Sequence, residues 1–119
     1  MIREKSLIRI GYWRENPRPG DPFDWIRQFF LADLPRAQDC VDASWSSSSE
    51  QPVVLAYLKA GRVHERYMGW SDCRICGCMN GTTDLTDGVF VWPDGLAHYV
   101  EAHSLKPDSV FIEHVLRTA

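Results

Sequence analysis

Four side chains in the second half of the chain have the types and the spacing of a metal site. Cys73 and Cys76 are separated by two residues and followed by Gly77, and His98 and His103 come later in the chain. Zinc prefers four ligands in a tetrahedron, and thiolate sulfur and imidazole nitrogen are typical donors. The two-residue spacer lets both sulfurs reach one ion, and the glycine permits a tight turn after the second cysteine. We therefore predict one zinc ion bound by these two cysteines and two histidines.

The spacing between the cysteines and the histidines favours a hairpin followed by a helix. The gap of 21 residues between Cys76 and His98 exceeds the roughly 12 residues of a DNA-reading finger. Asp87-Gly88 within the gap is a strong hairpin signal. These features predict that zinc would staple a β-hairpin to a helix bearing both histidines.

The position of His103 raises a geometric difficulty. On a regular helix, residues five apart differ by about 140° in direction, so His98 and His103 can share an ion only if the helix loosens at its end. Cys78 is the leading substitute if one histidine drops out. The next candidates are Asp72, His64 and Asp87.

Two other readings of the cysteine pair remain open. The first is a reduced, metal-free pair in a hairpin, with His98 merely packed on the core. The second is a redox pair, which usually lies at a helix N-terminus in a βαβ unit. Gly77, Asn80 and Gly81 do not continue a helix, so the redox reading fits poorly.

The whole chain has the composition of a globular protein. It has 119 residues, of which 45% are hydrophobic and 24% are charged, and this length predicts a single domain. We expect a strand and a basic arm in residues 1–20, a helical part in 21–61 and the metal-binding hairpin and helix in 62–119.

The charge and the apolar runs of the chain limit the kinds of partner and the cellular compartment that we expect. The net charge of −3 argues against nucleic acid, although a basic amino-terminal arm could touch an acidic partner. The arm's basic residues are Arg3, Lys5, Arg9, Arg14 and Arg18. No apolar run suits a signal peptide or a bilayer span. We predict a cytoplasmic protein without membrane contact, with a possible protein partner and an oligomeric state that the sequence leaves open.

The pattern of apolar residues predicts an α+β fold with a small antiparallel sheet of three or four strands and three or four helices. The helix expected from Pro22 to Leu31 carries an aromatic stripe, which predicts that one of its faces is buried. Gly95 is expected to weaken the helix from Pro93 to His103 by roughly 1 kcal/mol relative to alanine. The expected strands are Ser6 to Trp13, Arg62 to Met68 and Val89 to Trp92. The expected helices are Pro22 to Leu31, Glu50 to Lys59, Pro93 to His103 and one that begins at Pro107.

Three stretches of the chain resemble a group of small uncharacterised bacterial proteins. They are C-R-I-C-G from Cys73, L-T-D-G from Leu85 and W-P-D-G-L-A-H-Y-V-E-A-H from Trp92. In the group, glutamate is expected where this chain has Asp94. The resemblance extends from about Leu34 to Val115. It implies a bacterial, cytoplasmic origin but no activity.

Three functions follow as hypotheses. The first is a structural-zinc module that takes part in interactions or acts as an accessory protein. The second is a metal-dependent hydrolase with a zinc-bound water, in which Glu101 or Asp94 would act as general base. The third is a nucleic-acid-binding zinc module that uses the basic arm. The sequence contains neither an H-E-x-x-H motif nor the H-x-E…P-C-x-x-C motif of zinc deaminases, which argues against an enzyme.

Overall fold

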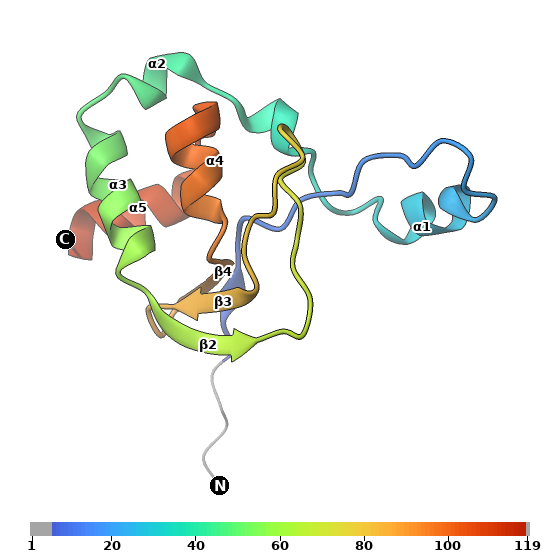
Figure 1. The fold of residues 1–119 in the computed structure, drawn as a ribbon. Coiled ribbons are helices and arrows are strands. Elements are labelled where there is room, and N and C mark those ends of the chain that lie inside the picture. The colour runs from blue at the N-terminus through green and yellow to red at the C-terminus, as the bar shows by residue number, and fades with distance from the viewer. Residues whose placement is uncertain (1–5, 119) are drawn as a thin grey trace, which may run out of the picture.

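A four-stranded sheet lies at one end of the molecule (Figure 1). The computed structural model describes residues 6–118. The strand order is β1-β4-β3-β2. The strands are β1 Ile8–Arg9, β2 Arg62–Arg66, β3 Thr83–Thr86 and β4 Phe90–Pro93. The α+β prediction is confirmed, with one difference: β2, β3 and β4 are antiparallel, whereas β1 runs parallel to β4. The sheet is therefore mixed, and the chain between β1 and β4, which holds three helices and the strands β2 and β3, is long enough for the crossover that a parallel pair requires.

Five helices form in the described part of the chain, one more than the upper expectation. They are α1 Asp24–Phe30, α2 Ala43–Ser46, α3 Glu50–Lys59, α4 Leu96–His103 and α5 Ser109–Thr118. A 3-10 turn, η1, covers Ala37–Cys40. The additional short helix, α2, begins after Asp42, whose side chain accepts a hydrogen bond from the backbone N–H of Trp45. None of these helices has both the length and the apolar content needed to cross a lipid bilayer.

The core lies between the sheet and the helices α3, α4 and α5. Trp92 of β4 is fully buried, and its Nε1 donates to the carbonyl oxygen of Leu58 on α3. Phe111 of α5 is also fully buried, with its ring centroid 5.4 Å from that of Trp92 and 5.1 Å from that of Phe90. These aromatic contacts join the strand that precedes α4 to the helices around it.

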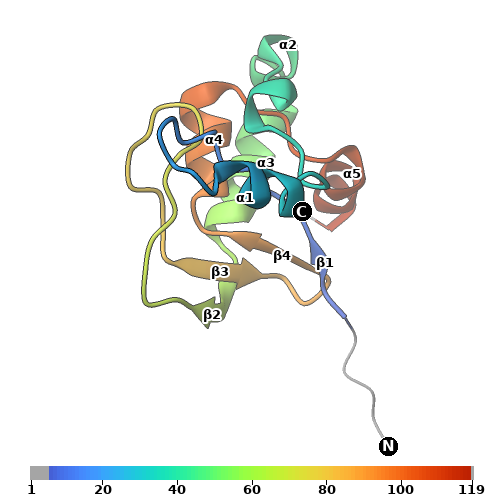
Figure 2. The ribbon, with the colours of Figure 1, turned by 90° about the vertical axis from the view of Figure 1, so that its right-hand side faces the viewer.

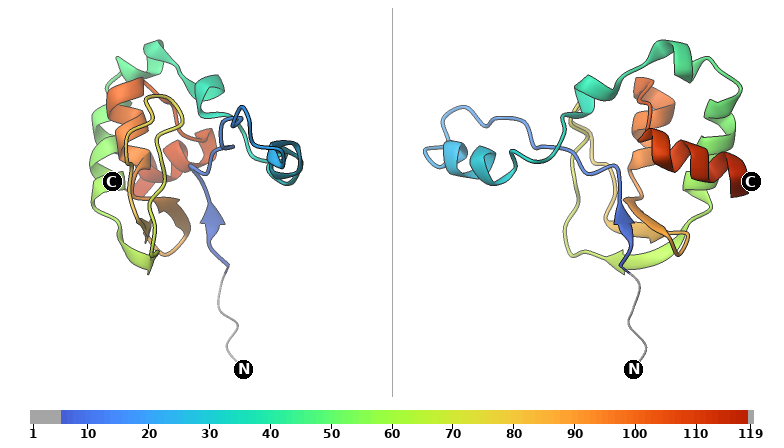
Figure 3. Two further views of the ribbon diagram at one scale, coloured as in Figure 1. Left: turned by 45° about the vertical axis from the view of Figure 1, so that its right-hand side comes forward. Right: turned by 180° about the vertical axis from the view of Figure 1, so that it is seen from behind.

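The helix α1 stands away from this core. The segment 14–34 projects sideways from the molecule in Figure 1 and in both views of Figure 3, whereas Figure 2 looks along it toward the core. No residue of α1 is buried. The prediction that its aromatic stripe faces the core is therefore wrong, because a helical period shows that one face is apolar but not what covers that face.

The cysteines lie on an excursion of the chain between β2 and β3. Residues 67–82 rise from β2 alongside α4 and return to β3 (Figure 1). Thr83–Thr86, which lies outside the three expected strands, is strand β3 and pairs with both β2 and β4. Of the expected basic arm, Arg3 and Lys5 lie outside the described residues, and the single-domain organisation stays a prediction.

Candidate metal centre

The cysteine turn is closed by its own backbone. The N–H of Gly77 donates to the carbonyl of Cys73 at 2.9 Å, and the N–H of Cys73 donates to the carbonyl of Cys78 at 2.8 Å. Gly77 has a φ of 77°, a left-handed conformation that favours glycine. The Sγ of Cys73 accepts N–H groups from Ile75 and Cys76, both at 3.4 Å. These contacts fix the position of the buried sulfur inside the turn.

Side chains from elsewhere in the chain hold this turn against α4. The Tyr99 hydroxyl accepts the backbone N–H of Arg74 at 2.6 Å, and burial raises the pKa of Tyr99 to about 12. The carbonyl oxygen of Arg74 accepts from Asn16 Nδ2 at 2.8 Å and from Gln38 Nε2 at 2.9 Å. The turn is therefore fixed by three segments that are distant in sequence.

The end of α4 solves the spacing problem of the two histidines. The N–H of Ser104 donates to the carbonyl oxygen of Tyr99, five residues earlier, and Ser104 is left-handed with a φ of 55°. A five-residue step is wider than an α-helical turn. The helix thus widens at its last turn, and the rings of His98 and His103 lie 4.9 Å apart between centroids.

The structure brings all four predicted ligands together. One donor atom from each of Cys73, Cys76, His98 and His103 lies within 4.8 Å of the other three. Cys76 Sγ is 3.4 Å from His98 Nε2, close to the roughly 3.5 Å between sulfur and nitrogen in a tetrahedral zinc site. The Nε2 atom of His103 is buried and has no hydrogen-bond partner in residues 6–118. The donor set and this orphaned imidazole atom fit a metal ion.

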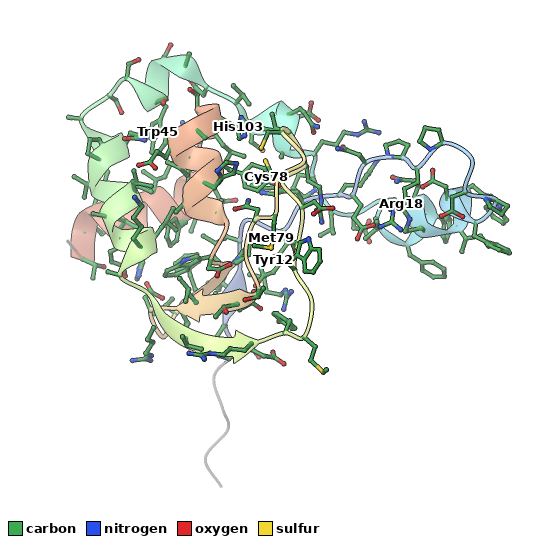
Figure 4. All side chains as sticks on the ribbon, viewed as in Figure 1. Tyr12, Arg18, Trp45, Cys78, Met79 and His103 are labelled. Atoms are coloured by element: carbon green, nitrogen blue, oxygen red, sulfur yellow. The ribbon has the colours of Figure 1, made fainter. Side chains whose placement is uncertain are left out.

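Cys78 lies beside the four-residue cluster. Its Sγ is 3.2 Å from Cys76 Sγ and 3.5 Å from His98 Nε2, and Figure 4 shows it on the same side of the molecule as His103. It is not part of the group whose donors are all mutually within 4.8 Å. Cys78 therefore stays an adjacent thiol that could replace a ligand.

The cluster separates the acidities of the two exposed thiols. The backbone N–H of Cys78 and its thiol, together with His103 and His98, lower the pKa of Cys76 to about 5. The hydrogen bond to Cys76, with burial, raises the pKa of Cys78 to about 11. Near neutral pH, Cys76 is thus the thiolate of the pair and the better metal donor.

The three reserve ligands named from the sequence lie elsewhere. His64 is exposed on β2, and Asp72 accepts a hydrogen bond from Trp70 Nε1 at 3.2 Å. Neither belongs to the group of converging donors. Asp87 is also absent from that group and belongs to a different network.

Asp87 organises the β3–β4 turn instead of a metal. Its carboxylate accepts from the Tyr57 hydroxyl at 2.5 Å and contacts His114 Nε2 at 2.8 Å. The N–H groups of Val89 and Phe90 donate to its other oxygen. Burial tends to raise the pKa of Asp87, but these hydrogen bonds outweigh burial and lower it to about 2. Its partners are 27 and 30 residues away, so the sequence alone gave no signal for them.

Comparisons with protein-family models, with curated proteins and with solved structures give no match. The resemblance to small bacterial proteins therefore stays a prediction, as does the cytoplasmic compartment. The geometry supports a possible metal site of two cysteines and two histidines, and arguments about its function rest on the contacts described above.

Proposed function

We propose that this chain is a zinc-stabilised protein-interaction module. A tetrahedral ion held by four protein side chains has no position left for a reactive water, which is the mark of a structural site. The four converging donors come from the cysteine turn and from α4. Zinc is the metal that best matches a mixed thiolate and imidazole set. The metal would therefore hold the fold together, and the interaction would take place elsewhere on the molecule.

The two alternative functions have weaker support in the contacts. Glu101, a candidate general base, is exposed and pairs with Lys59 of α3 at 3.4 Å, so it is not aimed at the donors. In the basic arm, Arg18 pairs with Glu15, and Arg9 lies 4.1 Å from the ring centroid of Tyr12. Arginines that already contact groups of the protein are less available to bind the phosphates of a nucleic acid.

The observation that carries the interaction proposal is the surface of α1. Its polar side chains face the neighbouring chain segment at Glu15. Arg27 pairs with Glu15 and Asp24, and Gln28 Nε2 donates to the carbonyl oxygen of Glu15. Its aromatic side chains turn outward, an arrangement opposite to that of a core-packed helix. The outward residues, with their exposed fractions, are Phe23 at 68%, Trp25 at 71%, Phe29 at 74% and Phe30 at 77%. We call these four the aromatic arm.

The occupant we propose for the aromatic arm is a second copy of the chain. Four aromatic side chains of about 200 Å² each, roughly 70% exposed, offer about 560 Å² per copy. Two arms packed together would bury about 1,100 Å², close to the lower limit of specific interfaces. A lipid surface is a poorer fit. The arm segment 14–34 carries three arginines against four acidic residues, whereas anionic lipids attract clusters of basic side chains.

Sedimentation of the purified protein tests this function. We expect a monomer–dimer equilibrium that shifts toward dimer from low to high micromolar concentration. The double variant Trp25→Ala, Phe29→Ala should be monomeric throughout, with an unchanged circular dichroism spectrum and unchanged zinc content. The matched control is Val110→Ala, since Val110 is also an exposed apolar side chain, at 64%, but lies on α5.

Elemental analysis of protein purified without added metal tests the other half of the proposal. One zinc per chain is expected. A wild-type protein that stays monomeric at high concentration, or that binds neutral or anionic vesicles through Trp25, would overturn the second-copy assignment. Protein that is folded without stoichiometric metal would overturn the structural role of zinc.

A further inference from the structure

A cavity of about 460 Å³ lies next to the cysteine excursion and is separate from the metal donors. It is bounded by the end of β1, by the excursion on both sides of the cysteine turn and by the start of α4. Figure 4 shows Tyr12, one of its walls, beside the excursion that carries Met79. The volume falls within the range of small-molecule sites. Five aromatic residues line it: Tyr12, Trp13, Tyr67, Trp70 and Tyr99.

One wall of this cavity is a buried carboxylate without a basic partner. Asp84 on β3 is only 3% exposed. Its Oδ2 accepts the Tyr67 hydroxyl at 2.6 Å, and among residues 6–118 no lysine, arginine or histidine comes within ion-pair distance. Fully buried aspartates are rare unless a positive charge compensates them. Asp84 is therefore placed to receive a cation from outside the chain.

A second carboxylate lines the same cavity. The side chain of Asp94 covers Gly81, since a Cβ on that glycine would lie 1.8 Å from Asp94 Oδ1. In the described part of the chain its carboxylate receives no side-chain or backbone hydrogen bond. Glycine at position 81 thus lets the carboxylate lie close to the backbone while keeping its oxygens free.

The two arginines that line the cavity are engaged with groups other than Asp84 and Asp94. Arg9 stacks on the Tyr12 ring at 4.1 Å, and Arg74 donates through Nη1 to the carbonyl oxygen of Asp72 at 2.5 Å. The Tyr12 hydroxyl is buried, and within residues 6–118 the neighbouring Asp84 carboxylate is the one group near enough to hydrogen-bond it. Burial and the nearby Asp84 raise the pKa of Tyr12, so it presents a neutral hydroxyl that can accept a hydrogen bond.

We propose that this cavity binds a small organic cation, a primary ammonium or guanidinium compound with an apolar chain. The cationic head would face Asp84 and Asp94 and donate to the Tyr12 hydroxyl. The apolar chain would lie against the aromatic walls, whose ring faces attract positive charge. Arg9 already uses the Tyr12 ring in this way, so it competes with the ligand. The contacts proposed for the ligand involve neither the four metal donors nor the four side chains of the aromatic arm.

Nuclear magnetic resonance titration with n-hexylamine tests the site, with n-hexanol and hexanoate as probes of the same chain length. We expect hexylamine to shift the backbone amides of Gly81 and Thr82, which line the cavity, while the alcohol and the carboxylate leave them unchanged. Binding of hexanoate in place of hexylamine would show an anion site at the two arginines and would overturn the proposal.

Variants locate the cation within the cavity. Asp84→Asn should weaken hexylamine binding at least tenfold. Because a buried substitution can impair folding, Asp94→Asn, at a partly exposed position, provides the second measurement and should weaken binding several-fold. Arg9→Gln should tighten binding by removing the competitor. The control is Asp33→Asn on the exposed arm segment, which should change nothing. Equal hexylamine affinity in Asp94→Asn and the wild type would overturn the assignment.

Discussion

Replacing Cys73 by serine is the sharpest test of the structural metal. Cys73 is 2% exposed and lies in the cluster of four donors. A structural zinc ion binds with about 10–16 kcal/mol near neutral pH, which is a dissociation constant of roughly 50 nM or lower. When free zinc exceeds the dissociation constant by about 10⁴, linkage adds about 5 kcal/mol to the free energy of unfolding. Small domains have about 5–15 kcal/mol in total. We therefore expect Cys73→Ser to lose zinc and most of its stability.

Urea denaturation with and without a chelator separates the metal from packing. Chelation should bring the wild-type protein to within about 1 kcal/mol of Cys73→Ser, and the variant should not respond to chelator. The control is Cys40→Ser, a half-buried thiol outside the cluster, whose Sγ makes a weak hydrogen bond, at 3.8 Å, to the Arg36 carbonyl. It should keep its zinc and most of its stability. If Cys73→Ser retained one zinc per chain, or lost equal stability with and without metal, the reasoning would be refuted.

Two further substitutions test the surroundings of the site. Gly95→Ala should destabilise the protein by about 1–3 kcal/mol through overpacking, because its Cβ would lie 2.2 Å from the carbonyl oxygen of Asn80; a stabilised variant would contradict this. Asp87→Asn should cost about 2 kcal/mol near neutral pH, since the pKa of Asp87 falls from 3.8 to about 2 on folding. A depressed pKa stabilises above the unfolded value, so the difference from wild type should shrink as pH falls from about 4 toward 2. An unchanged urea midpoint at pH 7 would argue against the network with Tyr57 and His114.

Local signals predicted the helices α1, α3, α4 and α5 and the strands β1, β2 and β4, but not α2 or β3. Helix α3 has the predicted bounds, Glu50–Lys59, because Pro52 near its start and Gly61 after its end act within one turn. The prediction that Gly95 lies within α4 and weakens it is wrong. Gly95 precedes the helix as its N-cap, and the approach of Asn80 requires a residue without a side chain. Such a contact joins segments 15 residues apart, which no local pattern encodes.

The candidate site was predictable in composition but not in geometry. Residue types and the C-x-x-C spacing named the four donors, since few other pairs place two sulfurs on one ion. The wider last turn of α4 depends on the hydrogen bond from Ser104 to Tyr99, and the pattern only indicated that some loosening was needed. The cavity carboxylate was missed altogether. Asp84 and Tyr67 are 17 residues apart, and each alone has the appearance of an exposed polar residue in a strand or turn.

The cysteine excursion has little hydrophobic packing of its own, which bears on the role proposed for a metal there. Within residues 67–82, Cys73 is the only buried residue, so hydrophobic packing contributes little to holding this stretch in place. Its anchors are the hydrogen bonds at Arg74 and the cluster of donors on α4. The same stretch supplies much of one wall of the cavity, including Trp70 and Gly81. A loop with almost no core of its own can shape a binding cavity only if something other than packing fixes it. An ion joining the turn to α4 would meet that requirement.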